Sequence, residues 1–103
     1  YADMLNGKQT PESVHAFFAK YFEGEKFVQV MPFGAEAETR SFLGSNNCSG
    51  WDGIQIFVTG NEERILVSSR FDNLGKGASG AAIQNMNLVL GLEETTGLNL
   101  SEE

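Results

Sequence analysis

The stretch best suited to binding a ligand is KGASG, residues 76–80, which stands directly before a run typical of a helix. Backbone amides at a helix N-terminus attract negative or polar groups, and glycines let a ligand approach the backbone closely. Lys76, Gly77, Ser79 and Gly80 are therefore the candidate binding residues. The alternative is that these small residues only permit close packing between a helix and a sheet, and one stretch can do both.

Cys48 and His15 are the only cysteine and the only histidine of the chain. A catalytic thiol needs a lowered pKa and usually a histidine base nearby. We expect His15 on the surface of the first helix and Cys48 as a small, partly buried residue of the sheet region, so no catalytic residue and no metal ligand is predicted. Asn46 and Asn47 could line a substrate cleft, although such pairs more often form turns.

The composition is that of an ordinary globular chain, with 103 residues of which 41% are hydrophobic. A net charge of -7 argues against a nucleic-acid or anionic-membrane surface. The lone cysteine excludes an internal disulfide and favours a reducing compartment, so the cytoplasm is expected. Neither a membrane span nor a signal peptide is predicted. Because the chain starts with Tyr1 rather than Met, we interpret it as a processed product or a fragment.

A first helix is expected over residues 11–23. Thr10 is the candidate N-cap, Pro11 takes the favoured first helical position, and Gly24 is the candidate C-cap. One face carries the apolar residues Val14, Phe17, Phe18, Tyr21 and Phe22.

A second helix is expected over residues 78–90, which include no charged side chain. Such a helix is predicted to be enclosed by protein or ligand on several sides. The acidic end of the tail that follows is expected to fray. The apolar stripe of this helix consists of Ala82, Ile83, Met86, Val89 and Leu90.

Strands are expected near residues 27–31, 40–48, 53–59 and 63–70, with a hairpin turn at Gly60-Asn61. Sequential strands joined so tightly are antiparallel. The sequence therefore predicts a single α+β domain over residues 1–103, with an antiparallel-rich mixed sheet covered by helices.

Residues 72–98, DNLGKGASGAAIQNMNLVLGLEETTGL, resemble the C-terminal signature of the N-acetyl-γ-glutamyl-phosphate reductase family. FLGSNNCSG and the order of a helix followed by FVQVMP are similar to the family's second domain. The resemblance implies a fragment of the substrate and oligomerisation domain of a glyceraldehyde-3-phosphate dehydrogenase-like fold. It also implies that the final helix packs on a nucleotide-binding domain elsewhere in the parent chain.

The parent implied by this resemblance is an NADP-dependent, homo-oligomeric enzyme of arginine biosynthesis that reduces an acyl phosphate to a semialdehyde. The turn with Lys76, Gly77, Ser79 and Gly80 would then lie near the nicotinamide end of NADP. The family's dinucleotide fingerprint has no counterpart here, and its nucleophilic cysteine and catalytic histidine lie upstream. We therefore expect this chain to be inactive alone. The alternatives are a reductase of aspartyl or aminoadipyl phosphates and a free-standing binding or assembly module.

Overall fold

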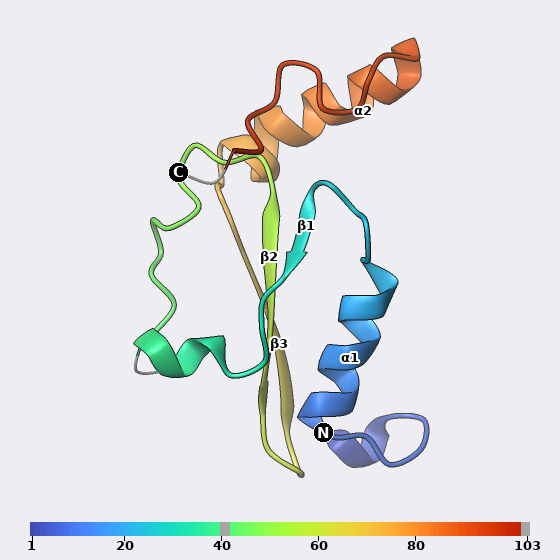
Figure 1. The fold of residues 1–103 in the computed structure, drawn as a ribbon, viewed down its shortest axis with the longest axis vertical. Helices are drawn as coiled ribbons and strands as arrows, with labels where there is room; N and C mark the ends of the chain where they lie inside the picture. Colours follow the sequence, from blue (N-terminus) through green and yellow to red (C-terminus); the bar gives the residue numbers. More distant parts are fainter. Residues whose placement is uncertain (40–41, 102–103) are drawn as a thin grey trace. The chain divides into compact units, whose positions relative to one another are not determined.

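The computed structural model describes residues 1–39 and 42–101, which divide into two compact units. The first unit comprises Tyr1–Leu43 and Gln55–Ser69, and the second comprises Gly44–Ile54 and Arg70–Glu103. The predicted α+β class is confirmed (Figure 1). The elements are α1 (Pro11–Tyr21), β1 (Val28–Val30), a 3-10 helix (Ala35–Thr39), β2 (Ile54–Gly60), β3 (Ile65–Phe71), a π-helix (Gly75–Ser79) and α2 (Gly80–Leu90), preceded by a 3-10 turn (Ala2–Met4).

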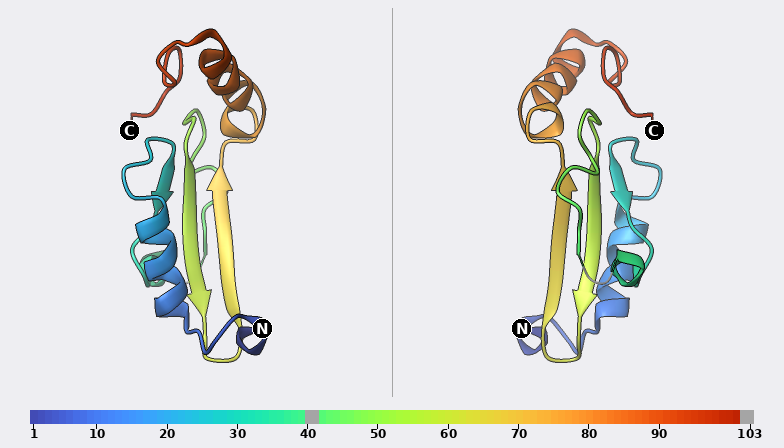
Figure 2. Two further views of the ribbon diagram at one scale, coloured as in Figure 1. Left: turned by 90° about the vertical axis from the view of Figure 1, so that its right-hand side faces the viewer. Right: turned by 90° about the vertical axis from the view of Figure 1, so that its left-hand side faces the viewer.

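The three strands form one sheet in the order β1-β2-β3. Figure 2 shows that β1 and β2 run in the same direction whereas β3 runs opposite to both. The sheet is therefore mixed, as predicted, but it is not rich in antiparallel pairs, and that part of the prediction is wrong. The parallel pair includes a hydrogen bond of 2.8 Å from the Met31 amide to the Ile56 carbonyl. A long connection joins β1 to β2, and it permits the parallel pairing that a tight turn would forbid.

The hairpin of β2 and β3 is confirmed, with a turn over residues 61–64. The Asn61 side-chain oxygen accepts the amides of Glu63 at 3.0 Å and Arg64 at 2.9 Å. Gly60 ends β2 with a φ of 122°, and a Cβ at this position would overlap the Arg64 carbonyl. Glycine is required here because both the backbone angle and the close approach exclude a side chain.

The predicted start of α1 is confirmed by its hydrogen bonds. The Thr10 hydroxyl accepts the Ser13 amide at 3.2 Å, while the Thr10 amide donates to the Ser13 hydroxyl at 2.9 Å. This reciprocal capping satisfies backbone donors that a helix leaves unpaired. The helix ends at Tyr21 with Phe22 as its C-cap, so the prediction of Gly24 as the C-cap is wrong, although Gly24 follows with a φ of 84°.

The core of the first unit lies on the central strand. Figures 1 and 2 show α1 over one face of the sheet and Ala35–Thr39 over the other. Ile56, Phe57 and Val58 are all buried. Because successive side chains of a strand point to opposite faces, this burial shows that both faces of β2 are covered.

His15 is half-buried, so the prediction of a surface histidine is wrong. Its Nε2 atom lies 2.9 Å from the Met31 carbonyl oxygen. The imidazole ring also meets the Phe33 ring edge-on, with 5.7 Å between the centroids. Although His15 lies one position off the apolar stripe of α1, its side chain reaches the connection that follows β1.

The strand predicted over residues 40–48 is wrong wherever the structure describes it. Residues 42–44 are irregular and 45–50 form turns, while 40–41 lie outside the described residues. The Ser49 amide donates to the Asn46 carbonyl at 3.1 Å. Serine, asparagine and glycine prefer such turns to a ladder, and this preference decides the local structure. In the described part of the chain, no helix is long and apolar enough to cross a membrane.

Candidate functional site

The candidate turn at Lys76 is helical from Gly75 onward, because the π-helix runs directly into α2. The sequence predicted the helix start at residue 78, three residues later. Three amides of the turn are bonded within it, namely Gly77 to the Asp72 carbonyl at 2.9 Å, Ser79 to the Leu74 carbonyl at 2.9 Å, and Gly80 to the Gly75 carbonyl. These amides are already occupied, so they do not offer the open helix N-terminus on which the binding prediction partly rested.

The carboxylate of Asp72 organises the start of this turn. Its Oδ1 atom accepts the Leu74 amide at 3.0 Å, and its Oδ2 atom accepts the Gly50 amide at 2.7 Å. The Gly50 and then the Leu74 amide lower the pKa of Asp72, since both stabilise the ionised carboxylate. An ionised Asp72 therefore connects the 45–50 turns to the candidate turn.

A second carboxylate, that of Asp52, explains two of the glycines. A Cβ at Gly75 would lie 2.8 Å from the Asp52 Oδ1 atom, and a Cβ at Gly80 would overlap the same atom. Gly80 is buried and has an ordinary helical φ of -62°, so space rather than backbone conformation requires glycine here. This finding supports close packing as one role of the small residues.

Asp52 is held in place by the C-terminal segment. The Asn99 amide donates to Asp52 Oδ2 at 2.8 Å, and the Asp52 amide donates to the Asn99 carbonyl at 2.8 Å. The Asn99 side chain donates to the Gly50 carbonyl at 2.8 Å. The tail therefore supports the carboxylate that lies against the glycines.

The Lys76 side chain turns back onto α2 and the tail. Its Nζ atom donates to Gln84 Oε1 at 2.5 Å, and Gln84 Nε2 donates to Glu94 Oε1 at 2.7 Å. Burial lowers the pKa of Lys76, whereas the negative charges of Glu94 and Asp52 act to raise it. The cation is thus balanced by acidic groups of its own unit.

The outer surface of the turn is small and uncharged. Gly77, Ala78 and Ser79 are exposed. The Ser79 hydroxyl donates to the Leu74 carbonyl at 2.8 Å, which turns it toward the backbone. With its amides bonded and its cation balanced, this surface suits a flat, neutral group better than a phosphate.

The fully buried side chain of α2 is polar, which its apolar stripe did not predict. Asn87 is 1% exposed, and its side-chain amide donates to the carbonyls of Glu94 and Thr96, each at 2.9 Å. Gly91 caps the helix with a φ of 68°. These bonds hold the segment after α2 against the helix, while the acidic end at 102–103, where fraying was predicted, lies outside the described residues.

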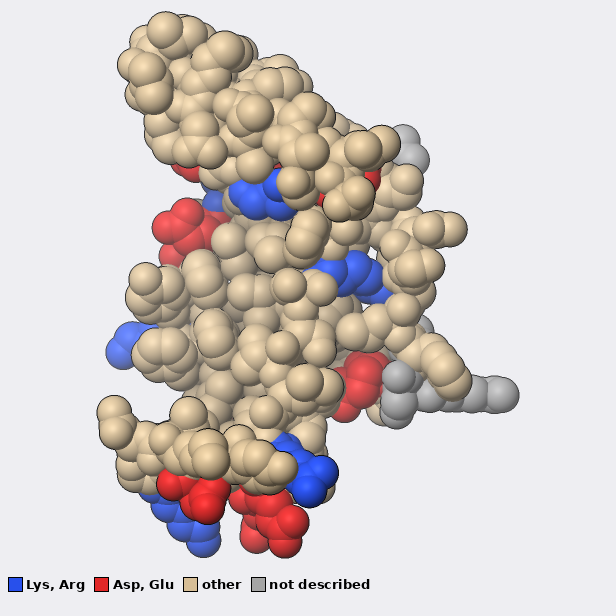
Figure 3. Space-filling model, turned by 180° about the vertical axis from the view of Figure 1, so that it is seen from behind, with Lys and Arg blue, Asp and Glu red and all other residues tan. Residues whose placement is uncertain are grey.

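Much of the apolar stripe of α2 faces outward in its unit. Met86 is 52%, Val89 85% and Leu90 61% exposed. Gly80–Leu90 contains no charged residue, and its surface in Figure 3 carries none. The described residues do not test the prediction that protein or ligand encloses this helix, so it stays a prediction. Within its own unit the helix is held by Gln84 and Asn87 instead.

Cys48 and the asparagines before it take structural positions. Cys48 is 2% exposed, and its Sγ atom lies 3.7 Å from the Arg70 carbonyl oxygen. The Arg70 guanidinium donates to the Gly44 carbonyl at 3.1 Å. Asn46 and Asn47 are exposed residues of the 45–50 turns. No cluster of potential metal ligands occurs among the described residues.

Sequence reasoning missed the polar residues that build this site, Asp52, Asp72, Gln84, Asn87, Glu94 and Asn99. Asp72 had a local signal, because Asp-Asn after a strand is typical of a turn in which the carboxylate bonds nearby amides. Asp52 had none, since it contacts residues more than twenty positions away.

Comparison with known proteins gives matches over nearly the whole chain. Residues 1–73 match the family model of the semialdehyde dehydrogenase dimerisation domain. An N-acetyl-gamma-glutamyl-phosphate reductase 2 of Nostoc sp. is 46% identical over 98 residues, 91% of this chain and 30% of that protein. The reductase of Rhodobacter capsulatus is 48% identical over 94 residues, 89% of this chain and 26% of the relative. That of Desulforamulus reducens is 40% identical over 101 residues, 98% of this chain and 28% of the relative.

These matches confirm the resemblance stated from residues 72–98. The chain spans less than a third of the length of these curated relatives.

Proposed function

We propose that this chain, which belongs to the family of semialdehyde dehydrogenase dimerisation domains, is part of an N-acetyl-γ-glutamyl-phosphate reductase. The observation that carries the proposal is the 46% identity to such a reductase over 91% of the chain. The relatives named above all bear that name, so we favour it over a reductase of aspartyl or aminoadipyl phosphates. The parent would reduce the acyl phosphate to a semialdehyde in arginine biosynthesis.

The chain would supply architecture to this reaction rather than a nucleophile or base. The Cys48 thiol is buried beside a backbone carbonyl, and His15 is engaged by Met31. Neither arrangement provides an accessible thiolate with a histidine base. The nucleophile and the base are therefore assigned to upstream parts of the parent.

A nicotinamide cofactor, NADP, would supply the hydride for the reduction. The exposed Gly77, Ala78 and Ser79 would form a small, flat surface for its neutral nicotinamide end. Two residues would support that surface from behind. Lys76 would do so through its bond to Gln84, and Gly80 through its packing against Asp52. Recognition of the cofactor phosphates would belong to the nucleotide-binding domain.

For the parent we propose a cytoplasmic homo-oligomer of the glyceraldehyde-3-phosphate dehydrogenase-like fold. This chain would form part of its substrate and oligomerisation domain, with the final helix packed on the nucleotide-binding domain. The uncharged, exposed α2 supports that packing. The dimerisation domain named by the family match also favours a second role, assembly of the oligomer.

The proposal is tested by enlarging Ala78 in the full-length parent. We expect the wild type to oxidise NADPH with N-acetyl-γ-glutamyl phosphate and the 103-residue chain alone to be inactive. Ala78→Phe would occupy the flat surface and raise the KM for NADPH by at least about tenfold, or roughly 1.4 kcal/mol.

Ala19→Phe is the matched control, because Ala19 is also an exposed helical alanine but lies on α1, outside the turn and outside α2. We expect its KM for NADPH to stay within about twofold of the wild type. Thermal melting would verify that both variants are folded. Wild-type cofactor kinetics for a folded Ala78→Phe would contradict the cofactor role of the turn, and a parent without turnover on this acyl phosphate would contradict the reductase assignment.

A further inference from the structure

We propose that the residues immediately before Tyr1 in the parent protein form a strand that pairs with the outer edge of β3, antiparallel to it. The proposal rests on the proposed function only in taking this chain as part of a longer protein. The strand would extend the sheet to the order β1-β2-β3-upstream strand. The residues that would contact this strand lie in the first unit of the structure.

The outer edge of β3 is open in the described part of the chain. β3 ends the strand order and has β2 as its only neighbour there. Leu66 is 59% and Val67 45% exposed. An open edge that carries apolar side chains pairs readily with another strand, so folded proteins usually cover it.

The N-terminus enters the molecule beside this edge. The Ala2 amide donates to the Glu63 carbonyl at 2.9 Å, at the end of the turn that leads into β3. The Arg64 guanidinium also lies over the Tyr1 ring, 5.3 Å from its centroid. A chain that arrives at Tyr1 along β3 must therefore run toward the hairpin turn, opposite to β3.

The hydrogen bonds at the turn show which backbone groups of β3 face its outer edge. The Arg64 carbonyl accepts the Asn61 amide and so faces β2, whereas the Glu63 carbonyl faces Ala2. Backbone groups alternate between the two sides along an antiparallel strand. The amides and carbonyls of Ile65, Val67 and Ser69 are thus predicted to face the outer edge.

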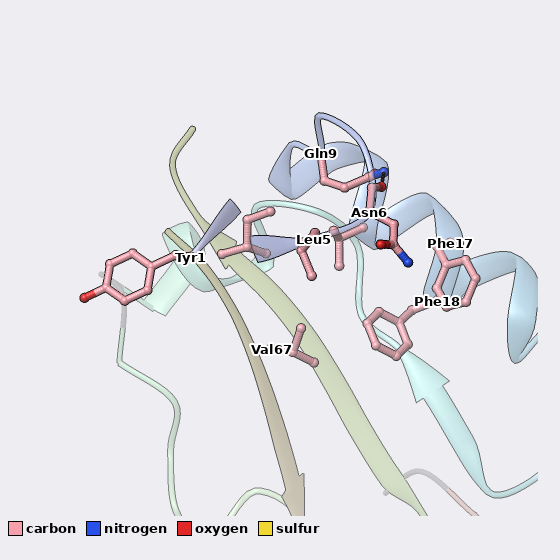
Figure 4. Close-up of a pocket in the computed structure, with 9 residues that line it drawn as sticks. Tyr1, Leu5, Asn6, Gln9, Phe17, Phe18 and Val67 are labelled. Carbon is pink, nitrogen blue, oxygen red and sulfur yellow. Dashed lines mark hydrogen bonds between the residues drawn. The ribbon is translucent and has the colours of Figure 1, made fainter. Parts of the chain in front are cut away.

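A pocket of about 520 Å³ lies between α1 and β3, on the side where the strand would be added. Its apolar lining comes from α1, β3 and the N-terminal segment, and includes Phe17, Phe18, Val67 and Leu5. Figure 4 shows these side chains around the same space. Alternate side chains of an added strand would point under α1 and fill this pocket.

The handedness of the connection through α1 provides an independent check on the proposed strand. In the left view of Figure 2, α1 lies in front of the sheet, β1 is at the left, β3 is at the right, and β1 and β2 point downward. An upstream strand to the right of β3 would also point downward, parallel to β1. The connection from it through α1 to β1 would then be right-handed, as about 98% of such crossovers are.

The occupant is assigned to the parent chain rather than to a second copy because of length and position. The relatives are more than three times as long as the region they share with this chain. The N-terminus already lies at the edge, so an upstream strand needs no further connection to reach it. A second copy that paired with β3 would have to displace the N-terminal segment at Tyr1 and Ala2.

The proposal specifies a register. Pairing Ala2 with Glu63 places the first, third and fifth residues before Tyr1 opposite Ile65, Val67 and Ser69. Because Ile65 and Val67 line the pocket under α1, we expect apolar side chains at these upstream positions. The residues between them would face the other side of the sheet.

Amide hydrogen exchange in the full-length parent, resolved by residue, tests the edge. We expect the amides of Ile65, Val67 and Ser69 to exchange at least about tenfold more slowly in the parent than in the 103-residue chain. Leu66 and Ser68 serve as internal controls, because their amides face β2 and should be protected in both. Equally fast exchange of the three edge amides in the parent would overturn the proposal.

Disulfide trapping identifies the occupant. In a parent variant with Ser69→Cys and a cysteine at the fifth residue before Tyr1, we expect an oxidised link within one chain, verified by peptide mapping. A link that forms only between two chains would overturn the proposal in favour of a second copy, and absence of any link in protein with wild-type melting would also overturn it. Neither readout requires reductase activity, so this proposal can fail while the proposed function stands, and the reverse.

Discussion

At the scale of single residues, Asp72 has the clearest dependence on protonation. Its carboxylate accepts the amides of Gly50 and Leu74, and these bonds lower its pKa. A lowered pKa in the folded state means that the ionised form contributes stability above the unfolded value of about 3.9. That contribution is lost as the pH falls through the lower, folded value.

We therefore expect Asp72→Asn to lower the free energy of unfolding at pH 7 and to reduce its dependence on pH below about 4. Urea unfolding of wild type and variant between about pH 7 and 2 measures both effects. Asp3→Asn is the control, since Asp3 is exposed in the N-terminal turn. If the two variants lose the same stability at every pH, the bonds to Gly50 and Leu74 contribute nothing specific.

The candidate turn shows how far residue types alone can predict a site. Glycines before a helix correctly indicated close approach, yet they could not show that Asp52 is the group that approaches them. Lys76 was predicted as a binding residue, whereas its ammonium donates to Gln84, and Gln84 in turn donates to Glu94 within the unit. Such pairings join distant positions, and no local pattern encodes them.

At the scale of elements, local signals predicted α1 and the hairpin because their causes are local. Thr10, Pro11 and Ser13 lie within one turn of the helix start, and Asn61 bonds amides two and three residues away. The parallel pairing of β1 with β2 joins Met31 to Ile56 across a long connection. Its direction depends on tertiary packing, which explains why the antiparallel expectation failed there.

The capping of α1 yields a quantitative prediction. Thr10→Ala removes the hydroxyl that accepts the Ser13 amide and should cost about 1 kcal/mol of stability. The measurement is the urea midpoint of the wild type and the variant at constant m-value.

Thr96→Ala is the matched control for this change. Thr96 is exposed and lies in a turn after α2, so its substitution should change stability by no more than about 0.5 kcal/mol. Equal midpoints for Thr10→Ala and the wild type would contradict the view that the cap stabilises the folded helix.

At the scale of the whole molecule, the exposed apolar residues of α2 offer a surface through which isolated chains can associate. Met86, Val89 and Leu90 lie on one side of a helix without charge. A net charge of -7 opposes close approach of two copies, but repulsion between exposed charges is screened at physiological salt within about 8 Å. The contact of apolar surfaces is much less sensitive to salt.

We therefore expect the isolated chain to associate reversibly, and more strongly as salt rises. Val89→Lys places a charge at the most exposed position of the stripe, 85% accessible in the wild type. The dissociation constant from sedimentation equilibrium should rise by at least about tenfold, or roughly 1.4 kcal/mol.

Ala19→Lys is the control, because it adds the same charge at an exposed position of α1. We expect it to change the dissociation constant only through its effect on net charge. If both variants weaken association equally, net charge alone controls it. If neither does, the copies meet through another surface, and the open edge of β3 becomes the next surface to substitute.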